Sequence, residues 1–180
     1  MKSTLLKSIV LFLSAILLYA CKGGEIYPII PSIEFEKSFY INRDSTNMLV
    51  FSIKFRDGDG DIGLEDGDTL PPYNNVKNPL TGKNTNIFYN NLYVEFLRKE
   101  GDTYNYVIAD FSGDTLRADV RVMPLTPEGK YKAIRGTIEV ALERSVLLND
   151  GDTVELRFLL IDRALHFSNA AESGDIIIVR

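Results

Sequence analysis

Apolar and polar residues alternate along most of the chain, and this period of two constrains the fold more than any other feature. The clearest example is the segment 49–55, where Leu49, Phe51, Ile53 and Phe55 occupy every second position. Successive side chains of a β-strand point to opposite faces of a sheet, so this segment is expected to be a strand with one buried face. Helical periodicity is nearly absent. The pattern therefore predicts an all-β protein.

Similar alternation or a short apolar run marks about eight strands along the chain. The segments are 33–35, 49–55, 92–96, 104–108, 120–122, 138–142, 154–160 and 176–179. Between them the tripeptide Gly-Asp-Thr occurs four times, starting at Gly67, Gly101, Gly113 and Gly151. Glycine supplies positive φ and aspartate bonds its own backbone, so these are expected to be turns between antiparallel strands. The simplest architecture is an immunoglobulin-like antiparallel β-sandwich over residues 32–180.

One connection, residues 64–90, breaks the alternation. It contains Pro71, Pro72 and Pro79 among many Asn, Thr and Gly residues. Such a long irregular stretch is uncommon inside a compact domain. Two interpretations stay open at this point, a functional loop or a disordered insertion. Tyr73 is one of the few side chains in it that could anchor it to the domain.

Residues 1–20 have the layout of a secretory signal segment. They contain Lys2 and Lys7, no acidic residue, and an almost unbroken apolar run up to Ala20. As a helix this run would reach only about 20 Å, whereas the hydrocarbon core of a bilayer is about 30 Å thick. The segment is therefore predicted to be cleaved rather than to span a membrane.

The end of this segment, Leu18-Tyr19-Ala20-Cys21, resembles the lipobox of bacterial lipoproteins. The resemblance implies cleavage before Cys21 and a diacylglycerol on its sulfur, with residues 21–31 as a short tether. The alternative is an ordinary signal peptide followed by an unmodified cysteine. Cys21 is the single cysteine of the chain, so no disulfide can form within it, and a free exported thiol would be open to oxidation. Lipidation is the preferred interpretation.

The most distinctive run is acidic and rich in glycine. Its candidate metal ligands are Asp57, Asp59, Asp61, Glu65, Asp66 and Asp68. Crowded carboxylates repel one another unless they are screened, and Ca²⁺ takes oxygens from flexible loops that contain glycine. Ca²⁺ is therefore a possible cofactor, and an acidic turn whose aspartates bond backbone N–H groups in water is the alternative. An EF-hand is rejected because Ile62 stands where that loop requires glycine.

Composition argues against several other functions. Removing residues 1–20 takes away two lysines and no acid, so the net charge of −5 becomes −7, and no nucleic-acid partner is expected. His166 is the single histidine, and no Gly-x-Ser-x-Gly elbow exists, which disfavours a nucleophilic triad. A zinc site would need more His and Cys ligands than the chain has. We expect no enzyme.

The segment 162–168 resembles the Asp-x-Ala-x-Asn-x-Ser ending of extracellular bacterial immunoglobulin-like modules, with His166 replacing the Asn. The resemblance implies that Asp162 and Ser168 fix a structural corner between the last strands. Together, the lipobox, the Asp-Gly-Asp-Gly-Asp-Ile-Gly run, the segment 124–130 and this ending resemble a family of Gram-negative outer-membrane lipoproteins with a predicted immunoglobulin-like domain and no assigned activity. Lys22 after the cysteine is compatible with that location.

The expected function is therefore that of a lipid-anchored outer-membrane module for binding or structure. Its partners would be the membrane, through the lipid on Cys21, and an envelope protein or a glycan that contacts residues 64–90. The alternative is a hydrolase acting on glycans through the clustered carboxylates, or a lipoprotein that captures glycans. The lack of tryptophan as a sugar platform weighs against the hydrolase.

Overall fold

A computed structural model describes residues 26–43, 46–109, 113–126, 132–142 and 147–179. The strands are β1 (Ser32–Arg43), β2 (Thr46–Asp57), β3 (Leu92–Glu100), β4 (Thr103–Tyr106), β5 (Arg117–Val120), β6 (Ile134–Leu142), β7 (Thr153–Leu160), β8 (Ala171–Glu172) and β9 (Ile176–Ile177). These described parts hold no helix that could cross a membrane. The predicted cleavage site and Cys21 lie outside the described residues.

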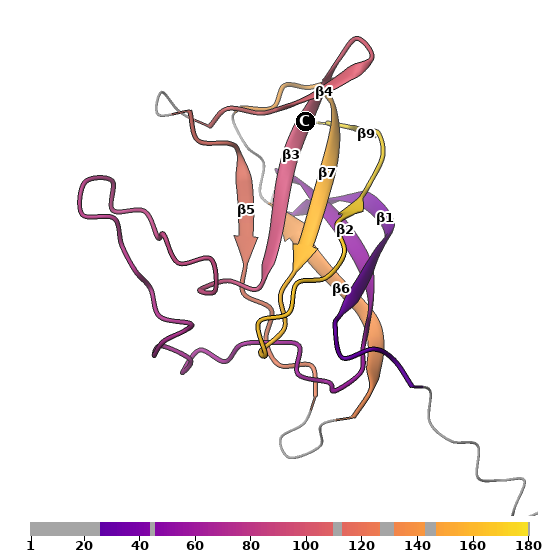
Figure 1. The fold of residues 1–180 in the computed structure, drawn as a ribbon. Helices are drawn as coiled ribbons and strands as arrows, with labels where there is room; N and C mark the ends of the chain where they lie inside the picture. Colours follow the sequence, from indigo (N-terminus) through magenta and orange to yellow (C-terminus); the bar gives the residue numbers. More distant parts are fainter. Residues whose placement is uncertain (1–25, 44–45, 110–112, 127–131, 143–146, 180) are drawn as a thin grey trace, which may run out of the picture.

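The strands form two antiparallel sheets that pack face to face (Figure 1). One sheet has the order β1-β2-β6. The other has the order β4-β3-β7-β8, with β5 also pairing with β3 and β9 with β7. The chain changes sheet after β2, after β5 and after β6, as in immunoglobulin-like sandwiches. The prediction of an all-β sandwich is confirmed, and the described residues contain nine strands in place of about eight.

The core lies between the two sheets. Phe51 of β2 and Phe158 of β7 are both fully buried, and their ring centroids are 4.8 Å apart. Phe35 of β1 stacks on the same Phe158 ring at 5.9 Å. Along β7, buried residues alternate with partly exposed ones, which is the pattern that the sequence predicts for a strand with one buried face.

The first strand is longer than the alternation suggests, because a bulge interrupts its pattern. The register of β1 against β2 shifts between Phe35 and Lys37. Before the shift the odd-numbered Ile33 is buried, and after it the even-numbered Tyr40 packs against the core. One extra residue moves every later side chain to the opposite face. A strict period of two therefore finds only the first part of this strand.

The predicted turn glycines fall into two groups. Gly101, Gly113 and Gly151 have positive φ values of 64°, 85° and 83°. Gly67 does not, although the aspartate after it behaves as expected: the Asp68 carboxylate accepts the Glu65 N–H at 2.8 Å. The connection 64–90 lies between β2 and β3 in the sequence. In space it projects from the side of the sandwich (Figure 1). We call this connection the insertion.

Candidate functional site

The acidic run begins at the end of a core strand. Asp57 is the last residue of β2, and its exposed fraction is 0%. The following residues return to the core, where Ile62 and Leu64 are buried. A backbone hydrogen bond holds this end of the loop: the Leu64 N–H donates to the Val122 carbonyl at 2.9 Å. The loop is therefore fixed at both ends, although its sequence is that of a flexible turn.

Close approach of other backbone segments explains the glycines of this loop. A Cβ atom on Gly58 would lie 2.3 Å from the Tyr27 carbonyl oxygen, so the end of the predicted tether packs directly on the acidic run. A Cβ on Gly60, where φ is 74°, would lie 2.2 Å from the Lys132 carbonyl oxygen. These positions require glycine both for space and, at Gly60, for backbone conformation.

Gly60→Ala is expected to destabilise the domain by roughly 2–4 kcal/mol, since it combines positive-φ strain with overpacking. Chemical denaturation with and without calcium would measure the change. Gly67→Ala is the matched control, because φ there is not positive and no atom lies within 4 Å of the new Cβ. Its expected effect is under about 1 kcal/mol. Equal losses for the two variants would contradict this explanation of the loop.

Three aspartates of the loop converge. Ligand oxygens of Asp57, Asp59 and Asp61 all lie within 4.8 Å of one another. The Oδ1 atoms of the three side chains are buried and have no hydrogen-bond partner among the described residues. Two of the other oxygens are engaged: Asp57 Oδ2 accepts the Asp61 N–H at 3.0 Å, and Asp61 Oδ2 accepts the Ala164 N–H at 2.9 Å. We call this group the aspartate cluster.

Two aspartates of the cluster, Asp57 and Asp61, resist ionisation. Burial, and then the neighbouring Asp59 carboxylate, raise the pKa of Asp57 to about 6. Burial, and then the Asp162 carboxylate, raise the pKa of Asp61 to about 6 as well. At neutral pH these two groups are therefore charged against an unfavourable environment. A bound cation would remove that penalty because it offsets both the repulsion and the lost hydration.

A fourth carboxylate, that of Asp162 on the turn after β7, is close enough to Asp57 and Asp61 to interact with them electrostatically. Asp162 is 2% exposed, accepts the His166 backbone N–H at 2.7 Å, and lies 2.9 Å from His166 Nδ1. The hydrogen bond to Asp162 raises the pKa of His166. Ser168 accepts the Leu160 N–H at 3.0 Å and donates to the Asn169 carbonyl at 2.8 Å. In the structure Asp162 and Ser168 thus bond backbone groups of this turn.

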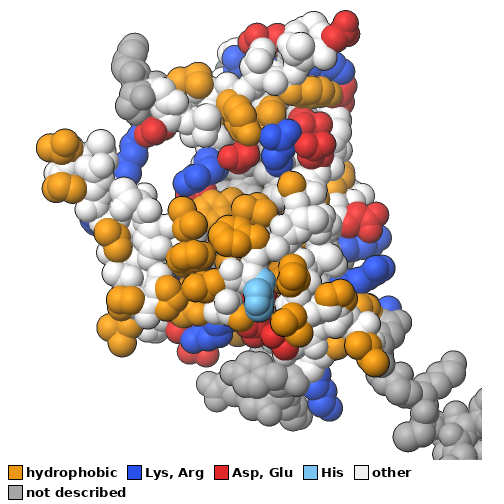
Figure 2. Space-filling model, viewed as in Figure 1, with side chains coloured by type: hydrophobic (Ala, Val, Ile, Leu, Met, Phe, Trp, Pro, Cys, Tyr) orange, Lys and Arg blue, Asp and Glu red, His pale blue; other side chains and the backbone are white. Residues whose placement is uncertain are grey.

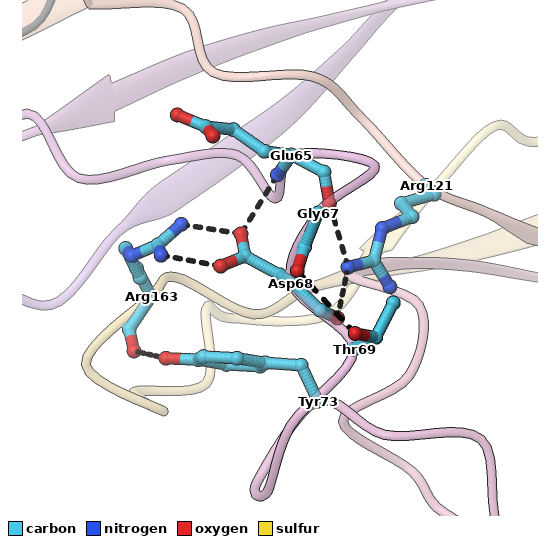
Figure 3. A network of polar contacts seen from close by, with 7 residues as sticks. All are labelled: Glu65, Gly67, Asp68, Thr69, Tyr73, Arg121 and Arg163. Atoms are coloured by element: carbon cyan, nitrogen blue, oxygen red, sulfur yellow. Dashed lines mark hydrogen bonds and ion pairs between the residues drawn. The ribbon is translucent and has the colours of Figure 1, made fainter.

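The structure does not bring the remaining candidate ligands into the cluster. The Asp68 carboxylate takes two hydrogen bonds from Arg163, each 2.6 Å long, and this pairing lowers the pKa of Asp68 (Figure 3). The side chains of Glu65 and Asp66 are exposed. In Figure 3 the Glu65 carboxylate lies apart from the Asp68–Arg163 pair, and no dashed line reaches it. Of six candidate ligands, three converge and three lie elsewhere.

Sequence reasoning missed the arginines of this region. Arg163 lies over the Tyr73 ring at 5.5 Å, and the Tyr73 hydroxyl donates to the Arg163 carbonyl (Figure 3). Arg121 donates to the carbonyls of Glu65 and Asp68 at 2.9 and 2.8 Å. Single arginines scattered among acids carry no motif. Their partners become visible only when the insertion is placed against the sandwich.

Two hollows border the insertion. A cavity of about 240 Å³ lies on the outer face of the sheet that contains β3 and β7, with Ile87 and Phe167 among its lining residues. Apolar side chains gather on this face, over β3, β5 and β7 (Figure 2). A more polar cleft of about 610 Å³ lies between the insertion and β5, and Thr81, Tyr89 and Asn90 help to line it. The insertion thus forms walls that a partner could contact.

Comparison with known proteins returns nothing similar: no protein-family model, no curated protein and no solved structure matches the chain. Function is therefore inferred from the geometry of the aspartate cluster and its surroundings.

Proposed function

We propose that the chain is a calcium-stabilised β-sandwich module that lipid on Cys21 holds on the outer membrane, and that it acts in binding or structure rather than in catalysis. The observation that carries the proposal is the group of three buried Oδ1 atoms in the aspartate cluster, which have no hydrogen-bond partner within the described parts of the chain. Buried carboxylate oxygens without a donor are costly, so their convergence favours a cation among them.

The donor set fits calcium better than other ions. Three carboxylates from a loop rich in glycine offer hard oxygen ligands, and backbone carbonyls and water can complete the six to eight oxygens that Ca²⁺ takes. Zinc prefers sulfur and nitrogen ligands, which this cluster lacks. The −7 charge expected after cleavage adds a general attraction for divalent cations.

The burial of the cluster argues against the glycan hydrolase. A glycosidase needs two carboxyl groups on either side of a substrate bond, one of them acting on a water or on the sugar itself. Here the Oδ1 atoms of Asp57, Asp59 and Asp61 are buried, and ligand oxygens of the three side chains lie within 4.8 Å of one another. A sugar chain could not reach between them. Holding a small cation is the chemistry that this arrangement supports.

The membrane part of the proposal rests on the lipobox and on the family resemblance. In a detergent phase partition, Cys21→Ser in the full precursor is expected to move the protein from the detergent phase to the aqueous phase. Two or more acyl chains hold a protein stably, whereas an unmodified N-terminus contributes no such anchor. The control is Ser32→Ala, which leaves the lipobox intact. Retention of the Cys21→Ser variant in the detergent phase would refute lipid anchoring.

Thermal unfolding tests the calcium part. If Ca²⁺ binds the folded state alone, a free concentration of 100 Kd adds about 2.7 kcal/mol of stability. For a domain of this size that corresponds to a rise in Tm of roughly 5–10 °C over the protein in EGTA. Mg²⁺ at the same concentration should give a smaller shift. An unchanged Tm at millimolar calcium would rule out a stabilising calcium site.

A further inference from the structure

Apart from the buried Leu64 at its start and the Phe88–Phe167 ring contact at 6.2 Å near its end, the insertion is held to the sandwich mainly by polar contacts. Three of its large apolar side chains are strongly exposed, namely Leu70 at 76%, Leu80 at 94% and Ile87 at 54%. Its ladder contact is a single isolated bridge between Lys77 and Asn84, which joins the insertion to itself. A segment with few buried apolar contacts has a low free energy of local opening. Its position therefore depends on a small number of hydrogen bonds.

Arg163 supplies part of this set, beside Arg121, which donates to the carbonyls of Glu65 and Asp68. The Arg163 guanidinium group holds the Asp68 carboxylate with two bonds of 2.6 Å and lies over the Tyr73 ring (Figure 3). The carboxylate is only 15% exposed in this pair. Bidentate arginine–carboxylate pairs are among the stronger and more directional polar contacts. Arg163 thus joins the turn after β7 to the first part of the insertion.

The same short segment also contacts the aspartate cluster. The Arg163 N–H donates to the Asp61 carbonyl at 3.2 Å, and the next N–H, that of Ala164, donates to the Asp61 carboxylate at 2.9 Å. Asp61 thus holds the backbone of the residue whose side chain holds the insertion. Without a cation, Asp61 also faces the carboxylates of Asp57, Asp59 and Asp162, which the structure places close enough to interact electrostatically.

We propose that calcium at the aspartate cluster orders the insertion, with Asp61 and Arg163 as the connecting residues. The inference rests on the calcium site proposed above and extends it to regulation. Calcium fixes Asp61, Asp61 fixes the backbone at residues 163–164, and Arg163 then holds Asp68 and Tyr73. In the calcium-free protein, mutual repulsion moves the Asp61 carboxylate and weakens this chain of contacts. The surface that the insertion offers to a partner therefore depends on calcium.

Thermodynamic linkage gives the inference a quantitative form. If calcium favours the docked insertion by some factor, then releasing the insertion must weaken calcium binding by up to the same factor. Arg163→Gln removes the bidentate pair and leaves the three aspartates in place. Its calcium affinity is expected to fall by about fivefold, within the usual range of coupling between sites. Asp57→Asn, in contrast, is expected to abolish binding.

Hydrogen exchange followed by mass spectrometry tests the coupling on the full chain in detergent. Peptides covering residues 65–80 should exchange at least about fivefold more slowly in calcium than in EGTA, and Arg163→Gln should remove most of this difference. Arg157→Gln is the control, because Arg157 pairs with Glu172 on the sheet and touches no residue of this network. Tyr73→Phe, which loses one hydrogen bond, replaces Arg163→Gln if that variant does not fold.

The outcomes separate the two proposals. Calcium binding that is measured by calorimetry but leaves exchange of residues 65–80 unchanged would overturn the coupling and preserve the calcium site. If the unmodified chain binds no calcium, both proposals are overturned. Protection that survives in Arg163→Gln or Tyr73→Phe would show that calcium acts on the insertion by another route and would also overturn the proposal.

Discussion

Asp57→Asn is expected to make the calcium-free protein more stable and to remove its response to calcium. The Asp57 side chain is fully buried, and its raised pKa of about 6 means that ionisation at neutral pH opposes folding. A neutral amide of the same shape removes that penalty, a gain on the order of 2–3 kcal/mol at pH 7. The amide also lacks the negative charge with which the Asp57 carboxylate would bind a cation. Denaturation in EGTA and in calcium would measure both effects.

The effect has a defined pH dependence. Because the pKa of Asp57 is higher in the folded state than its unfolded value of about 3.9, the folded state takes up a proton between pH 6 and 4. In the calcium-free unmodified protein, the contribution of Asp57 to stability therefore becomes more favourable as the pH falls through this window. The advantage of Asp57→Asn in EGTA should shrink accordingly from pH 7 to 4.

Asp66→Asn is the matched control for this variant. It removes the same charge from the same acidic run, but the Asp66 side chain is exposed and lies outside the cluster. Its expected effect on stability is within about 0.5 kcal/mol in EGTA, and its calcium response should be retained. If Asp66→Asn and Asp57→Asn behaved alike, general acidity rather than the geometry of the cluster would account for any calcium effect.

Phe158→Ala is expected to give the largest loss of stability, about 3–5 kcal/mol, because it leaves a cavity between the two sheets. The Phe158 side chain is fully buried and contacts the rings of Phe51 and Phe35 on the opposite sheet. The corresponding fall in Tm is roughly 8–15 °C. Thermal and chemical denaturation in calcium would measure it.

The same variant tests whether core and site are separate. Since Phe158 is not among the contacts of the aspartate cluster, its effect and that of calcium should add. The rise in Tm on adding calcium should thus be similar in Phe158→Ala and in the unmodified chain. Ile177→Ala, at a strand residue that is 61% exposed, is the control and should lose less than about 1 kcal/mol. A comparable loss at both positions would contradict the assignment of the core.

Much of the fold could be predicted because the physics that forms it is local. Alternation along 154–160 reports directly which side chains of β7 are buried. In β2 the prediction of one buried face is wrong in part, because Val50 and Ser52, which lie between the apolar positions, are buried as well. The prediction was incomplete where local patterns are interrupted. The bulge after Phe35 hides the second part of β1, and β8 is only two residues long, too short for a period to be seen.

The candidate site was predicted in part for a similar reason. The spacing of Asp57, Asp59 and Asp61 places three carboxylates in one tight turn, and the structure brings them together. Asp68 belongs to the same acidic run but pairs with Arg163, which lies 95 residues away in the sequence. Long-range pairing of single charged residues leaves no local pattern. Only the fold therefore shows which carboxylates of the run meet one another and which one meets an arginine.

Isothermal titration of calcium into the EGTA-treated and desalted full chain tests the central claim most directly. The aspartate cluster predicts one bound Ca²⁺ per chain, no measurable binding in Asp57→Asn or Asp61→Asn, and retained binding in Asp66→Asn. An unmodified chain that binds no calcium at millimolar concentration, or an Asp57→Asn variant that binds it as well as the unmodified chain, would contradict the claim.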